Sequence, residues 1–414
     1  MIELPASKSI GARFLVASYF AGTLPADPVF DDCDDLKVLQ RALLGLYSDE
    51  QPIDYGETPL DVNASGTALR LLTAVCASTP GADFVVTGIP RLMQRPMAPL
   101  IEALRSVGAK ITSQGSNGNG PYRVTGKQLD GGDLSIDANI SSQFISALMM
   151  AAPTWDKGMK LSFTTTLRSA PYVAMTAKMM EVFGIKVNLT DKFVEVPHAA
   201  YIAPPLFDVE ADWSAATFFL EAAVLGNLNI EIAGLLPPSI SWQGDSHAVE
   251  IFKKLGVKTD FPLGKAIFQK GFKTDIKHLS FDMSDHPDMV PALVVTCALE
   301  EISFTFTGVA NLRHKESDRL EALRQELLKL GYVPDIQDDA ICWNGEKKSI
   351  EPLPVDPHND HRIAMALAMA ALKTGKISIL NPDVVEKSFT RFWEQLSYLG
   401  LKCERKENIM TVTA

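Results

Sequence analysis

The ten residues from Asn311 to Leu320 combine charged and proton-transfer groups at the start of one expected helix. They include three positive charges and an imidazole, from Arg313, Lys315, Arg319 and His314. Leucines at 320, 323, 327 and 330 recur at helical spacing, and Gly331 is expected to end the helix. A helix N-terminus favours negative charge, so an anion should compensate these cations. Either Asp318 and Glu321 do so as caps, or Lys315 and Arg319 hold an anionic ligand and leave Glu316 free for proton chemistry.

Two other expected helix starts also carry cations. Ser7-Lys8-Ser9 opens the first helix, with Arg13 four residues after Ser9 on the same face. Asn359-Asp360-His361-Arg362 precedes the apolar run 363–372. One such case is ordinary surface charge, but three in one chain favour an anion site, which Arg95 could join. The spacing of His358, Asp360 and His361 fits no common zinc motif, so no metal is expected.

Two carboxylates could act as a general acid or base. Asp288 follows a proline at the start of an apolar run, and Glu316 lies between Lys315 and Ser317. Nearby cations would lower their pKa values and burial would raise them. Taken alone, each fits a helix cap or a salt-bridge partner better. A phosphate loop and a dinucleotide fingerprint are both missing, and the glycines of 115–120 are expected to form a turn.

Length and composition limit the class of protein. A chain of 414 residues with 46% hydrophobic residues predicts two or more folded domains. The net charge of -11 argues against binding to nucleic acid or an anionic membrane. The apolar run Val290–Leu299 is too short to span a bilayer, and no secretory signal is visible. Five scattered cysteines form no metal or redox spacing, which favours a reduced, cytoplasmic, soluble protein.

Six expected helix starts share one local form, a small polar or acidic cluster before an apolar run. They begin near positions 7, 65, 141, 212, 288 and 359, at intervals of roughly 70 residues. Short β-rich pieces lie between them, at 84–87, 160–163, 229–232, 303–307 and 377–380. This pattern predicts an α/β or α+β fold built from six copies of one unit, with several helix N-termini converging on one anion site. The alternative is chance, because Ser, Asp and Asn cap most helices.

Taken in order, these motifs resemble the EPSP (5-enolpyruvylshikimate-3-phosphate) synthase family, from Leu4 to about Gly400. The resemblance rests on Leu-Pro-Ala-Ser-Lys-Ser at 4–9, Ser-Gly-Thr-Ala-Leu-Arg at 65–70, Gln-Arg-Pro at 94–96, Ser-Ser-Gln-Phe at 141–144 and Ser-Ala-Pro-Tyr at 169–172. It continues with Pro287-Asp288, the segment 311–319, Asn-Asp-His-Arg at 359–362 and Glu-Lys-Ser-Phe at 386–389. Their number and order, more than any one motif, make the resemblance specific.

The resemblance implies a two-lobed enolpyruvyl transferase fold, an inside-out α/β barrel with three βαβαββ repeats in each lobe. Residues 7–210 would form the first lobe, on the shikimate 3-phosphate side. Residues 1–6 and 211–414 would form the second, discontinuous lobe, on the phosphoenolpyruvate side. The active site would lie in a cleft that closes on substrate. The family uses no cofactor, and we expect a monomer.

The implied reaction joins shikimate 3-phosphate and phosphoenolpyruvate by addition and elimination, releasing inorganic phosphate. By family match, the catalytic residues would be Lys8, Asp288, Glu316 and His361. Shikimate 3-phosphate would be bound by Lys8, Ser9, Arg13, Ser141, Ser142, Gln143, Ser169, Tyr172, Asp288, Asn311 and Lys315. Phosphoenolpyruvate would be bound by Lys8, Gly66, Arg95, Gln143, Arg319, Arg362 and Lys387. Asp288 would accept the 5-hydroxyl proton, and Glu316 with Lys8 would handle the proton at the methylene carbon.

The chain departs from the family pattern in three places. Gly11-Ala12 stands where relatives have Ser-Asn, Ala64 replaces an asparagine, and few residues precede Lys8. We expect activity to survive with some loss of phosphoenolpyruvate affinity. Two alternatives remain: a UDP-N-acetylglucosamine enolpyruvyl transferase, disfavoured because 91–94 has no cysteine, and a non-catalytic anion-binding relative.

Overall fold

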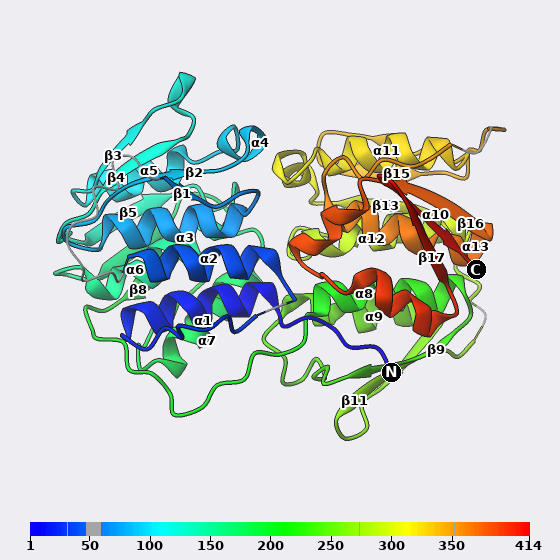
Figure 1. Cartoon of the computed structure of the whole chain (residues 1–414), viewed down its shortest axis with the longest axis horizontal. Helices are drawn as coiled ribbons and strands as arrows, with labels where there is room; N and C mark the ends of the chain where they lie inside the picture. Colours follow the sequence, from blue (N-terminus) through cyan, green and yellow to red (C-terminus); the bar gives the residue numbers. More distant parts are fainter. Residues whose placement is uncertain (31, 47–58, 273, 351–352) are drawn as a thin grey trace. The chain divides into compact units, whose positions relative to one another are not determined.

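The computed structural model describes residues 1–30, 32–46, 59–272, 274–350 and 353–414 (Figure 1). Contacts between residues divide the chain into two compact units. One unit comprises Met1–Ser7 and Glu210–Ala414, and we call it the split unit. The other comprises Lys8–Val209, and we call it the inserted unit. The inserted unit therefore enters and leaves the split unit at neighbouring points, since Ser7 N donates to Glu210 O across 2.7 Å.

The inserted unit contains seven α-helices in its described part and two four-stranded sheets. The helices are α1 (Lys8–Phe20), α2 (Asp34–Gly45), α3 (Gly66–Ala77), α4 (Pro90–Met93), α5 (Ala98–Ser106), α6 (Ser142–Ala151) and α7 (Ala170–Val182), with 3₁₀ turns η1 (Ser116–Gly118) and η2 (Ala152–Thr154). The first sheet has the order β1-β2-β4-β3, from β1 (Leu60–Asp61), β2 (Asp83–Thr87), β3 (Lys110–Ser113) and β4 (Tyr122–Thr125). The second has the order β5-β6-β8-β7, from β5 (Gly132–Ile136), β6 (Met159–Phe163), β7 (Asn188–Leu189) and β8 (Phe193–Val196).

The split unit contains seven further α-helices and three sheets in its described part. Its helices are α8 (Trp213–Leu225), α9 (Ala248–Lys254), α10 (Val290–Leu299), α11 (Arg319–Lys329), α12 (His361–Met369), α13 (Ala371–Thr374) and α14 (Phe392–Gln395). Its 3₁₀ turns are η3 (Gly244–His247), η4 (Pro287–Met289), η5 (Ala310–His314), η6 (Pro382–Lys387) and η7 (Leu396–Leu399).

The sheets of the split unit have the orders β10-β11-β9, β12-β13-β15-β14 and β16-β18-β17. Their strands are β9 (Asn229–Ala233), β10 (Val257–Asp260), β11 (Lys265–Lys270), β12 (His278–Asp282), β13 (Ser303–Thr307), β14 (Asp335–Ile336), β15 (Ala340–Trp343), β16 (Lys376–Leu380), β17 (Lys402–Lys406) and β18 (Ile409–Thr413).

All five sheets follow one pattern. In the four-stranded sheets, the first strand pairs parallel with the second, which pairs antiparallel with the fourth, which pairs antiparallel with the third. In the three-stranded sheets, the isolated parallel bridges Ile2↔Ile232 and Val355↔Ile379 occupy the place of the first strand. The mixed α/β class is therefore confirmed, and the βαβαββ unit recurs in five sheets. Of the six copies expected, the one that contains α1 and α2 shows no sheet among the described residues. Each β-rich piece expected from the sequence lies in a strand, namely β2, β6, β9, β13 or β16.

The six expected helix starts are all confirmed, at α1, α3, α6, α8, η4 with α10, and α12. Four have a side-chain cap: Ser65 accepts from Ala68 N, Ser141 from Gln143 N, Asp212 from Ala215 N and Asp360 from Arg362 N. The helix expected from the leucine spacing is α11, which Asp318 caps by accepting from Glu321 N at 3.1 Å. Asp318 therefore fills the capping role that was one of the two options for this segment.

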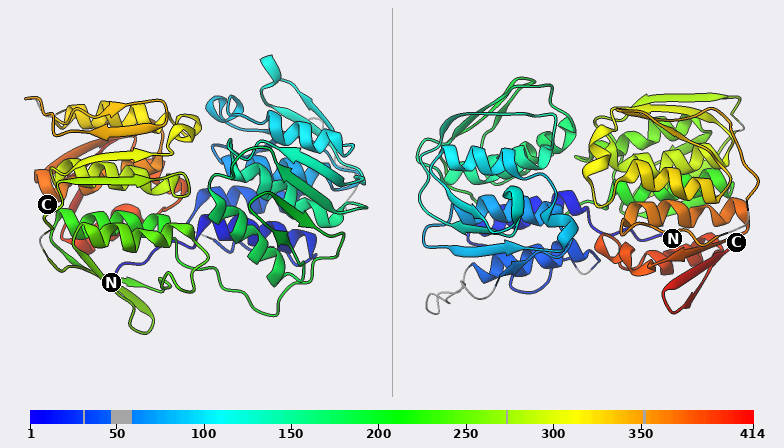
Figure 2. Two further views of the ribbon diagram at one scale, coloured as in Figure 1. Left: turned by 180° about the vertical axis from the view of Figure 1, so that it is seen from behind. Right: turned by 90° about the horizontal axis from the view of Figure 1, so that it is seen from above.

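Helices α8, α10 and α12 pack together inside the split unit, with strands on its outer faces (Figures 1 and 2). Every residue of α10 and α12 is buried, as is nearly all of α8. A helix that is apolar all round is stable only when protein surrounds it completely. The apolar runs 290–299 and 363–372, noted in the sequence, are therefore core helices. Among the described residues, none of the helices has the length and hydropathy needed to span a bilayer.

Glu221 interrupts this apolar core. It lies in α8 with no exposed surface, and within the described part of the chain neither carboxylate oxygen has a hydrogen-bond partner. Burial raises its pKa well above the ordinary glutamate value. The carboxyl group is therefore kept protonated by the core around it, since an unpaired charge there would be very costly.

Replacing Glu221 with glutamine should change how stability depends on pH. Because the folded-state pKa is raised, the wild type loses stability as pH rises above the ordinary glutamate pKa, by up to ~1.4 kcal/mol per pH unit. The E221Q variant lacks this titration, so its advantage in the free energy of unfolding should grow from pH 4.5 to pH 8. Denaturant unfolding at several pH values measures this difference. The matched control is Glu250→Gln, at an exposed position of α9. Parallel stability profiles for E221Q and wild type would contradict the assignment.

Candidate active site

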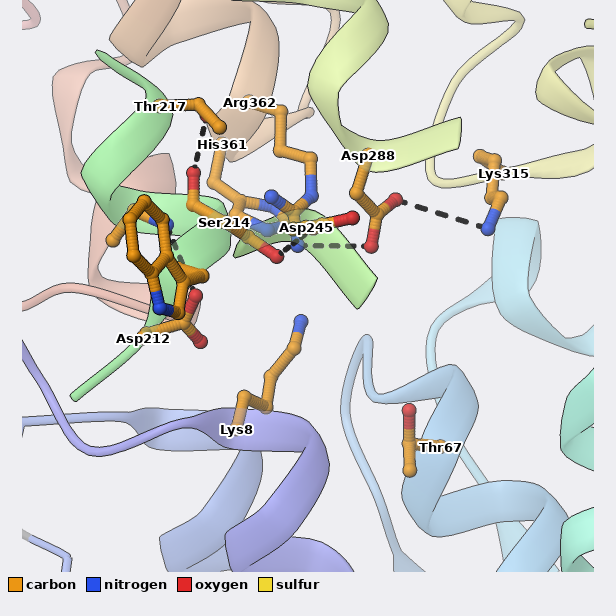
Figure 3. Close-up of polar contacts among 12 residues, drawn as sticks. Lys8, Thr67, Asp212, Ser214, Thr217, Asp245, Asp288, Lys315, His361 and Arg362 are labelled. Atoms are coloured by element: carbon orange, nitrogen blue, oxygen red, sulfur yellow. Dashed lines mark hydrogen bonds and ion pairs between the residues drawn. The ribbon is translucent and has the colours of Figure 1, made fainter. Parts of the chain in front are cut away.

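The strongest concentration of charge in the split unit surrounds Asp288, in the turn η4 (Figure 3). Its Oδ1 lies 2.8 Å from Arg319 Nη1 and 3.8 Å from Lys315 Nζ. Its Oδ2 lies 3.0 Å from Arg362 Nη2. The structure thus brings together the starts of α10, α11 and α12 at one carboxylate. This is the convergence of helix N-termini that the repeat predicted, seen here within one unit.

Arg319 links this carboxylate to two others. Its Nε lies 2.7 Å from Asp360 Oδ2, and its Nη2 lies 3.0 Å from Glu316 Oε2. The Arg319 side chain is only 1% exposed. Burial of the guanidinium is compensated by these charges, which raise the pKa of Arg319 above its ordinary value. Arg319 is therefore positioned and held positive by charge-assisted hydrogen bonds from three directions.

The ionisation of Asp288 is set by opposing effects. Burial alone would raise its pKa, but the charges of Arg362, Lys315 and Arg319 hold the pKa well below the usual aspartate value. In this arrangement Asp288 is a carboxylate at neutral pH. It can accept a proton, but it becomes an effective base only if the pull of the cations weakens.

Other residues expected from the sequence lie on the same elements. Asn311 is in η5, and its Oδ1 is buried without a hydrogen-bond partner in the described part of the chain. His361, the first residue of α12, has no exposed surface, and its Nδ1 lies 3.7 Å from Asp360 Oδ1. Lys387 ends η6, which packs against α12, and it is 9% exposed.

His358 instead contacts Glu326 of α11 at 2.8 Å. Among the described residues, no cluster of three metal-ligating side chains is present.

In the inserted unit, two arginines meet the start of α3. A Cβ built on Gly66 would lie 2.5 Å from Nη1 of Arg70 and 2.5 Å from Nη1 of Arg95. Arg70 donates to Gly66 O at 2.9 Å and is 3% exposed. Gln143, in the first turn of α6, donates to Thr67 Oγ1 at 3.1 Å. Gly66, Arg95 and Gln143 are therefore brought together, and any side chain at position 66 would have to displace a guanidinium group.

Arg13, which the resemblance expects to bind substrate, makes four hydrogen bonds inside the inserted unit. Its Nε donates to Thr176 Oγ1 at 2.7 Å, its Nη1 to Ser9 O at 2.7 Å, and its Nη2 to Ser146 Oγ at 2.9 Å and to Tyr172 O at 3.1 Å. It is 4% exposed, and burial lowers its pKa to about 10. Arg13 thus joins α1, α6 and α7, so its side chain orders the segments that carry Ser9 and Tyr172.

The remaining expected residues of the inserted unit lie at three helix starts. Lys8 begins α1 and lies 3.1 Å from Asp35 Oδ2 of α2. Ser141 and Ser142 begin α6. Ser169 precedes α7 with a left-handed backbone, at φ 55°. Left-handed geometry is uncommon for a serine and marks a backbone held by its surroundings.

Sequence reasoning gave no substrate-binding or catalytic role to Asp35, Arg70, Asp245 or Asp360. The sequence offers Asp360 only within the motif at 359–362 and in a rejected metal set, and in the structure it caps α12. Arg70 is the last residue of the motif at 65–70 and was given no role of its own. Asp35 and Asp245 carried no local signal, because each one's partner lies far along the chain, at Lys8 and Ser214.

The departures from the family pattern have partial structural explanations. A Cβ on Gly11 would lie 2.7 Å from Leu36 Cδ1, so glycine here permits close packing of α1 on α2. Asn63, the neighbour of Ala64, is exposed with a left-handed φ of 50°, and its backbone N donates to Asp61 Oδ1. The structure does not explain Ala12.

Comparisons with known proteins agree with this fold. The family model described as EPSP synthase (3-phosphoshikimate 1-carboxyvinyltransferase) matches residues 1–396. The chain is 39% identical over 404 residues to a 3-phosphoshikimate 1-carboxyvinyltransferase of Bacteroides fragilis, covering 96% of this chain and 95% of the relative. It is 35% identical over 353 residues to the enzyme of that name from Methanoculleus marisnigri, covering 84% and 80%.

A solved structure of EPSP synthase from Acinetobacter baumannii has the same fold. It matches with a TM-score of 0.72 at 24% identity and covers 99% of this chain and 97% of that one. The fold and the family match define an enolpyruvyl transferase. The chain belongs to the EPSP synthase family.

Replacing Gly66 with alanine should displace the guanidinium groups that now lie against it. The new methyl group would have to move Arg70 or Arg95, so we expect KM for phosphoenolpyruvate to rise tenfold or more with a smaller change in kcat. The matched control is Gly45→Ala in α2, where a Cβ would meet nothing within 4 Å. Steady-state kinetics of both variants measure the effect. An unchanged KM in G66A would show that Arg95 does not bind this substrate.

Proposed function

We propose that this chain transfers the enolpyruvyl group of phosphoenolpyruvate to the 5-hydroxyl of shikimate 3-phosphate, giving EPSP and inorganic phosphate. Family membership supports the reaction. The observation that carries the proposal is the convergence of Lys315, Arg319 and Arg362 on the single carboxylate of Asp288. This cluster offers cations that can bind an anionic substrate and a carboxylate that can accept a proton from the second substrate.

Both substrates are anionic, so binding must come mainly from cations. Arginine forks bind carboxylate and phosphate with fixed orientation. We assign Arg319, Arg362 and Lys387 of the split unit, and Lys8, Gly66, Arg95 and Gln143 of the inserted unit, to phosphoenolpyruvate. Shikimate 3-phosphate is assigned to Ser9, Arg13, Ser141, Ser142, Ser169, Tyr172, Asn311 and Lys315. Lys8, Gln143 and Asp288 serve this substrate as well.

The low pKa of Asp288 suggests how the base is activated. An incoming phosphate or carboxylate competes with Asp288 for Arg362 and Arg319. As these cations turn toward the substrate, their hold on Asp288 weakens and its pKa rises toward that of a useful base. Asp288 then accepts the 5-hydroxyl proton as the hydroxyl oxygen attacks C2 of the substrate. The base therefore gains strength only when its substrate is present.

The second proton transfer is assigned to Glu316, with Lys8. The methylene carbon is protonated first, which makes C2 electrophilic. Phosphate then leaves as the resulting methyl group loses a proton. Glu316 is anchored by Arg319 at 3.0 Å and is 13% exposed, so it is held in place yet accessible. His361, buried beside Asp360, supports the start of α12.

The rival reading as a UDP-N-acetylglucosamine enolpyruvyl transferase lacks a suitable thiol in the inserted unit. The cysteine nearest in sequence to the region 91–94 is Cys76, which is fully buried in α3. Burial raises the pKa of this thiol to about 12. A reactive cysteine needs a low pKa and access to solvent, so Cys76 does not fit that role.

Location and assembly belong to the same proposal. We infer a cytoplasmic monomer that binds small molecules and neither nucleic acid nor membrane. Cys33, Cys76, Cys297, Cys342 and Cys403 are free in the described structure, as expected of a reducing compartment. The net charge of -11 supports the absence of nucleic-acid binding.

The proposal is tested by phosphate release from phosphoenolpyruvate by the purified protein. Release should require shikimate 3-phosphate and should not occur with UDP-N-acetylglucosamine as the acceptor. Release with the second acceptor alone would establish the rival activity. No release with either would indicate a non-catalytic relative.

Replacing Asp288 with asparagine, or Glu316 with glutamine, should lower kcat by two to four orders of magnitude, the usual contribution of general acid-base groups. Both variants should still bind shikimate 3-phosphate, because the charge removed is negative. The measurements are turnover and calorimetric binding. The control is Glu321→Gln, a partly exposed carboxylate of α11 that contacts Arg324. A variant that retains near-normal kcat would remove that residue from the mechanism.

A further inference from the structure

Asp245, in the turn η3, is a buried carboxyl that the mechanism above does not use. It is 3% exposed. Its Oδ2 lies 2.5 Å from Ser214 Oγ in the first turn of α8 (Figure 3). Its Oδ1 has no hydrogen-bond partner within the described residues. A buried carboxylate oxygen without a partner is costly when charged, so the geometry itself favours a protonated group.

The charges that act on Asp245 come from each helix start around it. Asp288 of η4 and Asp212, the cap of α8, are negative, and Arg362 of α12 is positive. Burial, and then the charge of Asp288, raise the pKa of Asp245 to about 7, against the smaller lowering effects of Ser214 and Arg362. Asp245 and Asp288 are thus two neighbouring carboxyls with opposite tendencies, one holding its proton and the other ionised.

A stacked pair of imidazoles connects the turns that carry the two carboxyls. His247 of η3 and His286, directly before η4, lie with ring centroids 5.1 Å apart and planes at 11°. Burial, and then the charge of His247, lower the pKa of His286 to about 4, while Asp285 and Asp282 act in the opposite direction. His286 is therefore neutral above pH 5, and the stack can persist through the pH range in which Asp245 titrates.

We infer that Asp245 is a positioning residue whose protonation keeps Arg362 available to the anionic substrate. If Asp245 ionises, a second negative charge competes for Arg362 beside Asp288 and repels an incoming phosphate or carboxylate. By linkage, an anion bound at Arg362 must favour protonation of Asp245 to the same extent. Binding of phosphoenolpyruvate therefore takes up a proton at Asp245. This inference rests on the proposed function, in which Arg362 binds phosphoenolpyruvate.

The linkage gives a direction for affinity. At pH values below the pKa of Asp245, Arg362 is fully available to phosphoenolpyruvate. At pH values above it, kcat/KM for phosphoenolpyruvate should fall by up to about tenfold per pH unit. Asp245→Asn keeps the shape of the protonated acid and cannot ionise, so this loss should disappear. Ser214→Ala removes a hydrogen bond that lowers the pKa of Asp245, so the loss should move to higher pH.

The first experiment observes the proton directly and requires no turnover. Carbon-13 NMR of the full chain, labelled at the aspartate carboxyl carbons, should show one resonance titrating near pH 7. That resonance should be missing in D245N and should titrate at higher pH in S214A. Added sulfate, whose charge is constant over this range, should raise the midpoint in wild type by occupying Arg362. A carboxyl that titrates only below pH 5 would overturn the inference, as would a midpoint that sulfate does not move.

The second experiment measures kcat/KM for phosphoenolpyruvate from pH 5.5 to 8.5 in wild type, D245N and S214A. A phosphate ester itself changes charge near pH 6, so the informative quantity is the ratio of variant to wild type at each pH. The ratio for D245N should rise with pH above neutrality. The control is Glu221→Gln, a second buried carboxyl in the same unit, whose ratio should stay flat. A flat ratio for D245N would refute the role of Asp245.

The two experiments separate this inference from the proposed function. If wild type shows no phosphate release, the proposed function fails, and the NMR titration with sulfate still decides whether Asp245 responds to an anion at Arg362. If turnover is normal but D245N and wild type share one pH profile, the function stands and the role of Asp245 is rejected.

Discussion

The site depends on matching buried charge with buried charge. Arg319 is almost completely removed from water and contacts the carboxylates of Asp288, Glu316 and Asp360. Removing one partner from such a group leaves an uncompensated charge, which is far more destabilising than the pair is stabilising. The positions of α10, α11 and α12 are therefore fixed by the same contacts that define the chemistry. Catalytic geometry and local stability cannot be varied independently here.

The repeated unit explains why the charges gather at helix starts. The central helices are apolar on every side, so polar groups are tolerated only at their ends. Helix N-termini expose N–H groups and attract anions. In the split unit the three core helices begin near Asp212, Asp288 and Asp360, one acid in each repeat. Equivalent acids have thus taken different tasks: Asp212 caps its helix, Asp360 caps its helix and also binds Arg319, and Asp288 binds the arginines.

Much of this could be predicted from the sequence because it depends on local rules. Helix starts follow from capping residues before apolar runs, and strands from short β-rich pieces, so α3, α11 and β13 were all found. The partners of the charged groups could not be predicted in the same way. Asp35 meets Lys8, and Asp245 meets Ser214, only after the chain has folded. The contacts of Arg13 with Thr176, Ser146 and two backbone carbonyls carried no local signal either, because Thr176 and Ser146 lie more than a hundred residues away in the sequence.

The bridge between Ile2 and Ile232 has a consequence for synthesis of the chain. The segment around Ile2 supplies the first strand position of a sheet whose other strands begin at Asn229. On a ribosome it emerges before the inserted unit, yet its partner strand appears only after the whole of Lys8–Val209 has been made. Domains generally fold as units during synthesis. We therefore expect the inserted unit to finish folding while the segment around Ile2 still lacks its partner strand. When the inserted unit folds first, it brings Ser7 and Glu210 together. This shortens the loop that must close before Ile2 can pair with Ile232. The early-made strand should therefore be among the last elements to dock.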